Sequence, residues 1–230
     1  MFEKYYESPA YGEWCGRVYG KDLKQLGCVT IDELEILYRE VDLPPDSLIL
    51  DMGCGPGYLS AEIASHYSAR LTGVDTDEGS ISHAIKAFHN NPAYHFVLGD
   101  GRKISYAAST FDMICFCDSL HFTRSGEELY ELLDRCFNML KPGGKLVIFC
   151  GKDNHEADIW GQKSNIPFKT IDLTETNKKL WSNVFCELVT MASELRVEIP
   201  ETYERLKDEC IQIIRNNGWL PRRLYILYKQ

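Results

Sequence analysis

The chain alternates short apolar runs with amphipathic stretches through most of its length. Five apolar runs have the length and composition of buried strands: residues 47–52, 70–75, 94–99, 111–117 and 144–150. Between them, apolar positions recur at helical spacing in residues 58–67, 79–90 and 126–140. Strands that alternate with helices of this length are typical of βαβ units, which build a largely parallel sheet covered on both faces.

The first 45 residues follow this pattern less closely. Up to about Gly27 they are rich in aromatic residues and glycine without a clean period, which predicts an irregular arm or short helices. Thr30 and Glu33 then have the spacing of a capping box, in which each side chain satisfies a backbone N–H at the start of a helix. We expect an amphipathic helix to follow and to end before Pro44.

The pattern loosens again after Gly151. Residues 168–173 have the pattern of a strand, and a wide apolar stripe from Leu180 to Leu195 predicts a helix. Residues 201–217 predict a second helix, and residues 223–229 close the chain as a strand.

These segments together predict an α/β fold of the Rossmann-like kind. It would have a seven-stranded, mostly parallel sheet, helices on both faces, and two helices inserted between the last two strands as a lid. We expect a single domain over residues 1–230, with an N-terminal cap or arm at 1–45, a binding core at 46–150, and the lid and last strands at 151–230.

The length and net charge of the chain limit the classes of function that it can have. At 230 residues, the chain can form one well-filled domain. Its net charge of -9 repels phosphate backbones, so we expect no nucleic-acid partner. The basic clusters, Lys178-Lys179 and Arg222-Arg223, are too short to change that expectation, and we interpret both as solvated surface residues.

The nine cysteines do not have the spacing of a metal site. None of them forms a C-x-x-C pair, and the histidines are scattered, so we expect no bound metal. Cys115 and Cys117 share one face of a predicted strand, where they fit as small core residues. The odd cysteine count and the lack of a signal peptide favour a reducing cytoplasm. No apolar run approaches the roughly 20 residues that span a bilayer, so we expect no membrane segment.

The most informative segment is the turn after the first strand. The apolar run ends in Asp51, and Gly53, Gly55 and Gly57 follow before an apolar stretch with helical spacing. This arrangement brings bare backbone and a helix N-terminus close to a ligand, although a turn that only needs positive φ is the alternative. The G-x-G-x-G spacing after an acidic residue resembles motif I of the class I S-adenosylmethionine-dependent methyltransferases, and it departs from the G-x-G-x-x-G of dinucleotide-binding folds. The resemblance implies that the glycines face the methionine carboxylate of the cofactor, with Asp51 near its ammonium and sulfonium.

Acidic residues at the ends of the next two strands extend the resemblance. In this family, an acidic residue after the second strand binds the ribose hydroxyls, which implies that role for Asp75, with Thr76 beside it. Asp100 stands where the family binds the exocyclic amine of adenine, and the backbone N–H of Gly101 where it reads a ring nitrogen. Taken alone, both acidic residues also fit helix caps or turns.

The end of the fourth strand is expected beside the methionine end of the cofactor and the substrate. Phe111-Asp112 resembles the start of the fourth motif of the family. The resemblance implies that Cys117, Asp118 and Ser119 lie at the end of this strand beside the methionine moiety and the substrate, with cofactor contacts for Cys117 and Asp118. His121 lies just beyond, and a histidine there can take a proton from a hydroxyl or ammonium substrate. A histidine packed at a helix start, with a structural hydrogen bond, is the alternative.

The segment from Leu140 to Phe149 closely resembles the family's L-K-P-G-G-x-L segment, a helix stop and turn before the fifth strand. The resemblance then covers about residues 48–150 in the expected order. It implies that the chain binds S-adenosyl-L-methionine and transfers its methyl group to a small molecule by direct displacement, with S-adenosyl-L-homocysteine as product. In-line positioning in a dry pocket would supply most of the catalysis.

Two other functions stay open. A methyltransferase for RNA or protein would need a basic face, and the chain lacks the N/D-P-P-Y/F tetrapeptide of nucleic-acid N-methyltransferases. A non-catalytic sensor of the cofactor or its product would use the same glycine turn. Several aromatic residues of the arm and lid either line a small site or pack in the core, and we favour packing for each: Tyr5, Tyr6, Tyr11, Trp160 and Trp181. The sequence does not indicate the methyl acceptor, the use of a general base or the oligomeric state.

Overall fold

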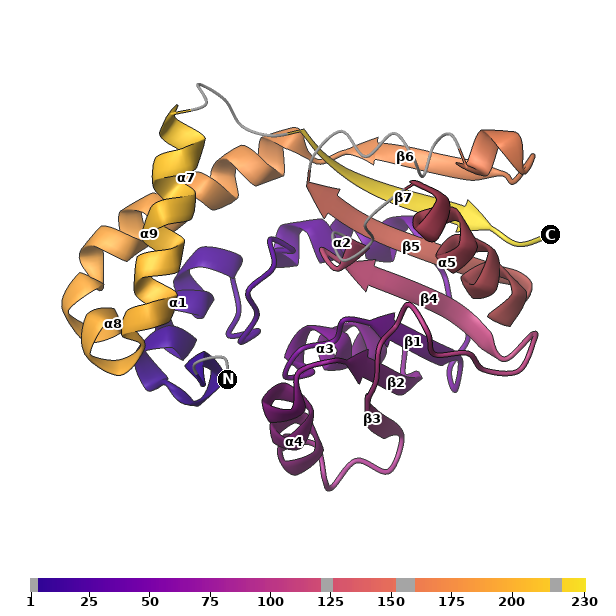
Figure 1. Ribbon diagram of the computed structural model, residues 1–230, viewed down its shortest axis with the longest axis horizontal. Coiled ribbons are helices and arrows are strands. Elements are labelled where there is room, and N and C mark those ends of the chain that lie inside the picture. Colours follow the sequence, from indigo (N-terminus) through magenta and orange to yellow (C-terminus); the bar gives the residue numbers. More distant parts are fainter. Residues whose placement is uncertain (1–3, 121–125, 152–159, 216–220) are drawn as a thin grey trace.

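The structure is a computed structural model that describes residues 4–120, 126–151, 160–215 and 221–230. Its sheet has the strand order β3-β2-β1-β4-β5-β7-β6 (Figure 1). The bounds are β1 Leu48–Met52, β2 Arg70–Asp75, β3 Tyr94–Leu98, β4 Phe111–Cys117, β5 Leu140–Gly151, β6 Phe168–Asp172 and β7 Arg222–Tyr228. Strands β1 to β5 run parallel, and β7 runs antiparallel to both β5 and β6. The predicted seven-stranded, mostly parallel α/β fold is confirmed.

Helices cover both faces of the sheet, as the apolar pattern predicts. The helices of this core are α2 Ile31–Glu40, α3 Tyr58–His66, α4 Glu78–Ala87 and α5 Gly126–Met139. On one face, Leu37 of α2 and Ile63 of α3 belong to the same buried cluster as Met113 of β4. On the other face, Leu133 of α5 packs in a second cluster with Ile114. Successive strand residues point to opposite faces, so adjacent positions of β4 contribute to two separate cores.

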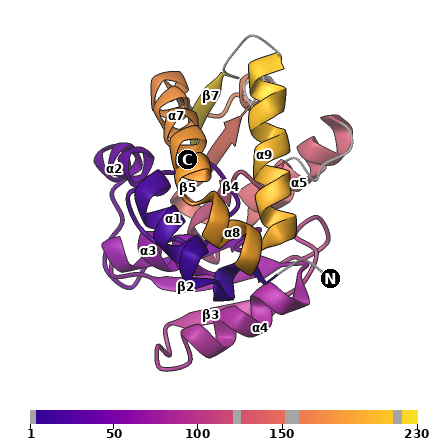
Figure 2. The same cartoon turned by 90° about the vertical axis from the view of Figure 1, so that its left-hand side faces the viewer.

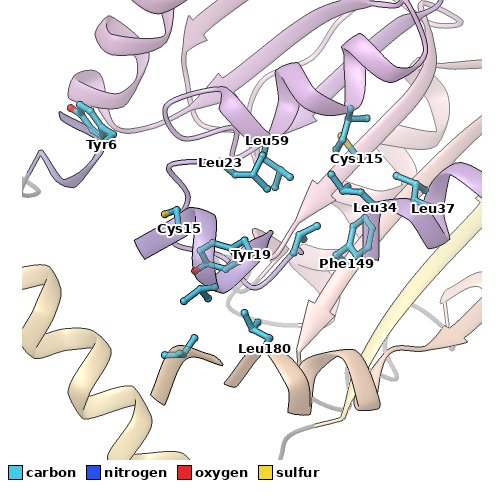
Figure 3. Packing of buried hydrophobic residues seen from close by; sticks show 14 of the residues in the cluster. Tyr6, Cys15, Tyr19, Leu23, Leu34, Leu37, Leu59, Cys115, Phe149 and Leu180 are labelled. Atoms are coloured by element: carbon cyan, nitrogen blue, oxygen red, sulfur yellow. The ribbon is translucent and has the colours of Figure 1, made fainter. Parts of the chain in front are cut away.

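Segments from both ends of the chain build a helical cap on the side to which β4 and β5 point (Figures 1 and 2). Its elements are η1 Tyr5–Glu7, α1 Pro9–Tyr19, α7 Thr174–Thr190, α8 Ala192–Glu198 and α9 Pro200–Arg215. Ser8, the N-cap of α1, donates its hydroxyl to the carboxylate of Glu198 at 2.6 Å. Tyr19 of α1 and Leu180 of α7 belong to one buried cluster (Figure 3). None of the helices in the described residues is long and apolar enough to cross a membrane.

The cap differs from the predicted lid at its centre. The apolar stripe from Leu180 to Leu195 predicts one helix, but α7 ends at Thr190 and α8 begins at Ala192. The described residues between β6 and β7 therefore form three helices, not the predicted two. Met191 and Leu195 are both buried, so the break keeps the apolar stripe in the core while α8 packs against α9.

The capping box of α2 forms only in part. Thr30 accepts a hydrogen bond from the backbone N–H of Glu33 at 3.2 Å, as predicted. The return bond is absent from the described contacts, because the carboxylate of Glu33 binds the guanidinium of Arg222 at 2.8 Å. A charge-assisted bond to a buried guanidinium replaces the weaker local one.

Residues 140–144 belong to β5 instead of forming the predicted turn. Helix α5 ends one residue before them, and a register shift in the pairing of β5 with β4 absorbs the extra residues. The ammonium of Lys141 pairs with Asp112 at 2.7 Å, and the same carboxylate accepts the backbone N–H of Leu48 at 2.8 Å. This segment therefore ties β5, β4 and β1 together at the edge away from the cap.

Candidate active site

A cavity of about 300 Å³ lies at the carboxyl ends of the parallel strands. The strand order reverses there, because β2 and β3 continue to one side of β1 while β4 and β5 continue to the other. Ligands of open α/β sheets bind at such switch points. The cavity is lined by Met52, Gly53, Val74, Asp75, Thr76, Gly99, Asp100, Gly101, Arg102, Phe116, Ser119 and Leu132.

The glycine turn between β1 and α3 needs its glycines for two different reasons. All three have positive φ, at 91° for Gly53, 53° for Gly55 and 85° for Gly57, a region that other residues rarely adopt. A Cβ at Gly57 would lie 2.7 Å from Cε1 of Phe96, so a side chain does not fit. A Cβ at Gly55 would meet no protein atom within 4 Å, which leaves free space beside the backbone.

The N–H groups of this turn are engaged within the protein. Those of Gly53 and Cys54 donate to the carbonyl of Val74, at 2.7 and 3.1 Å, and that of Gly57 donates to the carbonyl of Cys54 at 3.1 Å. The N–H of Gly55 donates to Asp75. Of the three glycines, Gly53 lines the cavity, and Gly55 and Gly57 lie outside its lining. Their expected contact with a carboxylate stays a prediction.

Asp75 connects the turn to the neighbouring strand end. Its Oδ2 accepts the N–H of Gly55 at 2.8 Å, and its Oδ1 accepts the N–H of Asp77 at 2.9 Å. A carboxylate has about four lone-pair positions, so each oxygen retains acceptor capacity on the cavity side. Thr76 lines the cavity directly beside it.

Asp100 and Gly101 form the opposite wall after β3. Both oxygens of Asp100 bind the guanidinium of Arg102 at 2.9 Å, and this partner lowers the pKa of the carboxyl below its usual value. The backbone of Gly101 packs against Met52, which also lines the cavity. A Cβ at Gly101 would lie 3.2 Å from Sδ of Met52. Arg102 also lines the cavity, although it is not among the predicted site residues. Its position two residues after Asp100 is the feature of the sequence that indicates it.

Asp51 lies outside the cavity wall, although it precedes the glycine turn. It is 1% exposed and accepts hydrogen bonds from the hydroxyl of Ser60 and from Sγ of Cys115, the latter at 3.5 Å. Burial raises the pKa of its carboxyl to about 6. Asp51, Cys115 and Cys117 place their ligand atoms within 4.8 Å of one another. Two of these three side chains are already hydrogen-bonded to each other, because Sγ of Cys115 donates to Asp51.

Asp118 also lies outside the wall, and its carboxylate is engaged elsewhere. It binds Nη1 and Nη2 of Arg222 at 2.5 and 3.0 Å. The interpretation of Arg222 as a solvated residue is wrong, since its side chain is 1% exposed and sits between Asp118 and Glu33. Ser119, the next residue along the chain and expected at the same strand end, does line the cavity.

Of the remaining predicted residues, one lies outside the described residues and the aromatic ones pack in the core. His121, the predicted catalytic base, lies outside the described residues. Tyr5, Tyr6 and Tyr11 are buried in the cluster of the cap and do not line the cavity. Trp160 packs edge-on against a phenylalanine of α5 and donates its Nε1–H to Asp134 at 2.9 Å, which fits the packing interpretation. Trp181 is half-buried against the cap cluster.

Comparison with known proteins agrees with this fold and cavity. Residues 49–144 match a family model described as a methyltransferase domain. A 166-residue stretch is 29% identical to the phosphoethanolamine N-methyltransferase of Triticum aestivum, covering 64% of this chain and 32% of that protein. The malonyl-[acyl-carrier protein] O-methyltransferase of Legionella pneumophila is 30% identical over 92 residues, which cover 40% of this chain and 32% of that protein. The chain spans less than half the length of the curated relatives it matches.

Solved structures share the fold over nearly the whole chain. The cyclopropane synthase MmaA2 of Mycobacterium tuberculosis superposes with a TM-score of 0.77 at 15% identity, covering 98% of this chain and 95% of that one. The Haemonchus contortus phosphoethanolamine N-methyltransferase 2, in complex with S-adenosyl-L-methionine, gives 0.75 at 17% identity and covers 96% and 56%. Fold and cavity thus define an α/β protein with a candidate ligand site at the switch point of its sheet. Within it, the segment of residues 49–144 is similar to a methyltransferase domain.

Replacing Gly57 by alanine should destabilise the protein, because the new Cβ would overlap the ring of Phe96 and strain a φ of 85°. We expect a loss of about 1–3 kcal/mol in the free energy of unfolding, measured with urea. Gly16→Ala is the matched control: it lies in α1 with no atom within 4 Å of the added methyl. It should gain about 0.5–1 kcal/mol. Equal effects of the two substitutions would contradict the assigned geometry.

Asp51→Asn should change how stability depends on pH. Burial raises the pKa of Asp51 from 3.8 to about 6, so the native state holds this proton more tightly than the unfolded chain does. The resulting stabilisation, about 3 kcal/mol, is complete below about pH 4 and is lost as the pH rises through about 6. Urea unfolding should therefore show the stability of the wild type, relative to the variant, falling across this window and levelling above it. A difference that is constant with pH would show that Asp51 titrates normally.

Proposed function

We propose that the protein is an S-adenosylmethionine-dependent methyltransferase that acts on a small molecule. The observation that carries this proposal is the position of Asp75. Its carboxylate lines the cavity at the end of β2, between the glycine turn after β1 and the Asp100 turn after β3. A carboxylate with free lone pairs at this place suits two adjacent hydroxyls, such as those of a ribose.

The residues around Asp75 fit the rest of the cofactor. The free space beside Gly55 accepts a group that approaches bare backbone, and the turn at Asp100 and Gly101 offers a polar edge for adenine. Apolar lining from Phe116 and Leu132 suits the flat faces of a base. We place the adenosine in this cavity and the methionine end toward the glycine turn.

The chemistry then depends mainly on placement. When bound, the cofactor supplies a methyl group on a sulfonium, which a nucleophile displaces directly. The chain's own contribution is to hold the two reactants in line and to exclude water, which lowers the entropic barrier. We propose that the cap of α1, α7, α8 and α9 covers the acceptor, and that His121 takes a proton from it.

The acceptor class rests on the charge of the chain and on its relatives. A net charge of -9 disfavours a polyanionic substrate. The similar proteins include enzymes named for phosphoethanolamine, a malonylated carrier protein and geranyl diphosphate. We propose a small metabolite as acceptor, a cytoplasmic location, and a single domain in which residues 46–150 bind the cofactor.

Asp75→Ala should weaken binding of S-adenosyl-L-methionine about 10–100-fold, because two charge-assisted hydrogen bonds are lost. Isothermal titration calorimetry measures this directly. Asp77→Ala is the matched control, since Asp77 caps α4 through the N–H of Ser80 at 2.8 Å and does not line the cavity. It should cost about 1 kcal/mol of stability but leave the affinity within about twofold. A wild type that binds no cofactor, or equal losses in both variants, would contradict the proposal.

Turnover separates an enzyme from a sensor. Wild-type protein incubated with a metabolite extract and radiolabelled cofactor should label a small molecule, and Asp75→Ala should label it more slowly. Binding by the wild type without any labelled product would show a sensor of the cofactor, and the catalytic part of the proposal would then be wrong.

A further inference from the structure

Three charged side chains form a buried ion cluster beside the end of β4. Nε of Arg222 lies 2.8 and 3.0 Å from the two oxygens of Glu33, and its terminal nitrogens lie 2.5 and 3.0 Å from those of Asp118. The side chains of Arg222 and Glu33 are 1% and 0% exposed, and that of Asp118 is 15% exposed. The guanidinium is thus bound on both sides by carboxylates, one of them in a bidentate pair.

The cluster joins parts of the chain that are far apart in sequence. Arg222 begins β7, Glu33 lies in the first turn of α2, and Asp118 directly follows β4. The backbone N–H of Cys28, in the loop after α1, donates to Asp118 at 2.7 Å. The hydroxyl of Thr176, in α7, donates to Glu33 at 3.0 Å. The loop after α1, the helices α2 and α7 and the strands β4 and β7 therefore meet at one ion cluster.

Stability alone is a weak reason for such a cluster. Two carboxylates face one cation, so the group buries a net negative charge, and burial raises the pKa of Glu33 even though Arg222 opposes the shift. Buried ion pairs seldom stabilise a fold more than apolar side chains of the same volume. Their better-supported contribution is to select one arrangement of the groups they connect.

Asp118, which this cluster holds in place, is next to the cavity wall. Asp118 has a φ of 59°, a left-handed conformation that turns the backbone sharply at the end of β4. The next residue, Ser119, lines the cavity, and its hydroxyl donates to the carbonyl of Met52, which also lines it. The side chain of Asp118 binds Arg222 in the cluster, and the adjoining residue, Ser119, is part of the cavity wall. A shift of Asp118 therefore moves the wall.

We propose that Arg222 is a positioning residue for the cofactor site. Held by Glu33, it fixes Asp118 and through it the Asp118–Ser119 turn, and so couples the cap to the cavity wall. This role rests on the proposed function, because the site that it shapes is the proposed cofactor site. Arg222 contacts neither the cavity nor, on this proposal, the cofactor.

The test removes the two most buried charges of the cluster, Arg222 and Glu33, and keeps Asp118. In the double variant Arg222→Met with Glu33→Met, an apolar pair replaces these ions, and Asp118 keeps its bond from the N–H of Cys28. The stability of this variant in urea should fall, because Asp118 loses its bidentate partner. Its affinity for S-adenosyl-L-homocysteine, by calorimetry, should also fall by about tenfold, within the usual range of coupling between packed groups.

Lys141→Met is the matched control, because Lys141 forms an ion pair with Asp112 at the far edge of the sheet. It should lower stability and leave the affinity within about twofold. If the double variant does not fold, Arg222→Lys replaces it; the lysine keeps the cation but lacks the fork that binds both carboxylates, so it should show a smaller loss in the same direction. A folded variant of Arg222 that binds as tightly as the wild type would overturn the positioning role alone. A wild type that binds no S-adenosyl-L-homocysteine would overturn the proposed function, and this role with it.

Discussion

The hydrogen bond from the N–H of Gly55 to the carboxylate of Asp75 holds the candidate site together. It joins the turn after β1 to the end of β2, two neighbours in the parallel sheet, at 2.8 Å. The turn can bend back to Asp75 only because its glycines accept positive φ, and Gly55 leaves room beside the backbone. One carboxylate thus fixes the shape of the cavity and presents acceptor positions to its interior.

The sheet and the cap contribute to the site in different ways. The strand ends supply the cavity wall, and their positions follow from the register of a rigid parallel sheet. The cap shares one buried hydrophobic cluster with the sheet. The ion cluster of Arg222, Glu33 and Asp118 adds polar contacts between them, through Thr176 of α7 and the loop after α1. The proposed direct displacement of a methyl group needs few dedicated groups, so on this proposal the cap is the natural place for acceptor recognition.

The sequence predicted the sheet and the polar residues at the ends of its first three strands, because both depend on local patterns. Strand bounds follow from apolar runs, and the glycine turn, Asp75 and Asp100 stand at strand ends that can be read directly. The burial of Arg222 could not be read in this way, since its partner Glu33 is 189 positions away in the chain. A basic pair near a chain end has the pattern of surface residues, and only tertiary contacts show that one member is buried.

The break at Met191 has a related cause. It leaves the apolar periodicity intact, because both helices that flank it bury the same stripe. The carboxylate of Asp51 binds Ser60 and Cys115, and its place near the ammonium and sulfonium of the cofactor stays a prediction. Pattern alone gives the order of residues along a strand, and the pairing of that strand decides which face each one occupies.

A crystal structure of the protein with S-adenosyl-L-homocysteine tests the central claim most directly. The account predicts the ribose hydroxyls about 3 Å from the carboxylate of Asp75, with adenine against the turn at Asp100 and Gly101. A ligand bound elsewhere, or a ribose held by another side chain while Asp75 binds only backbone, would contradict it.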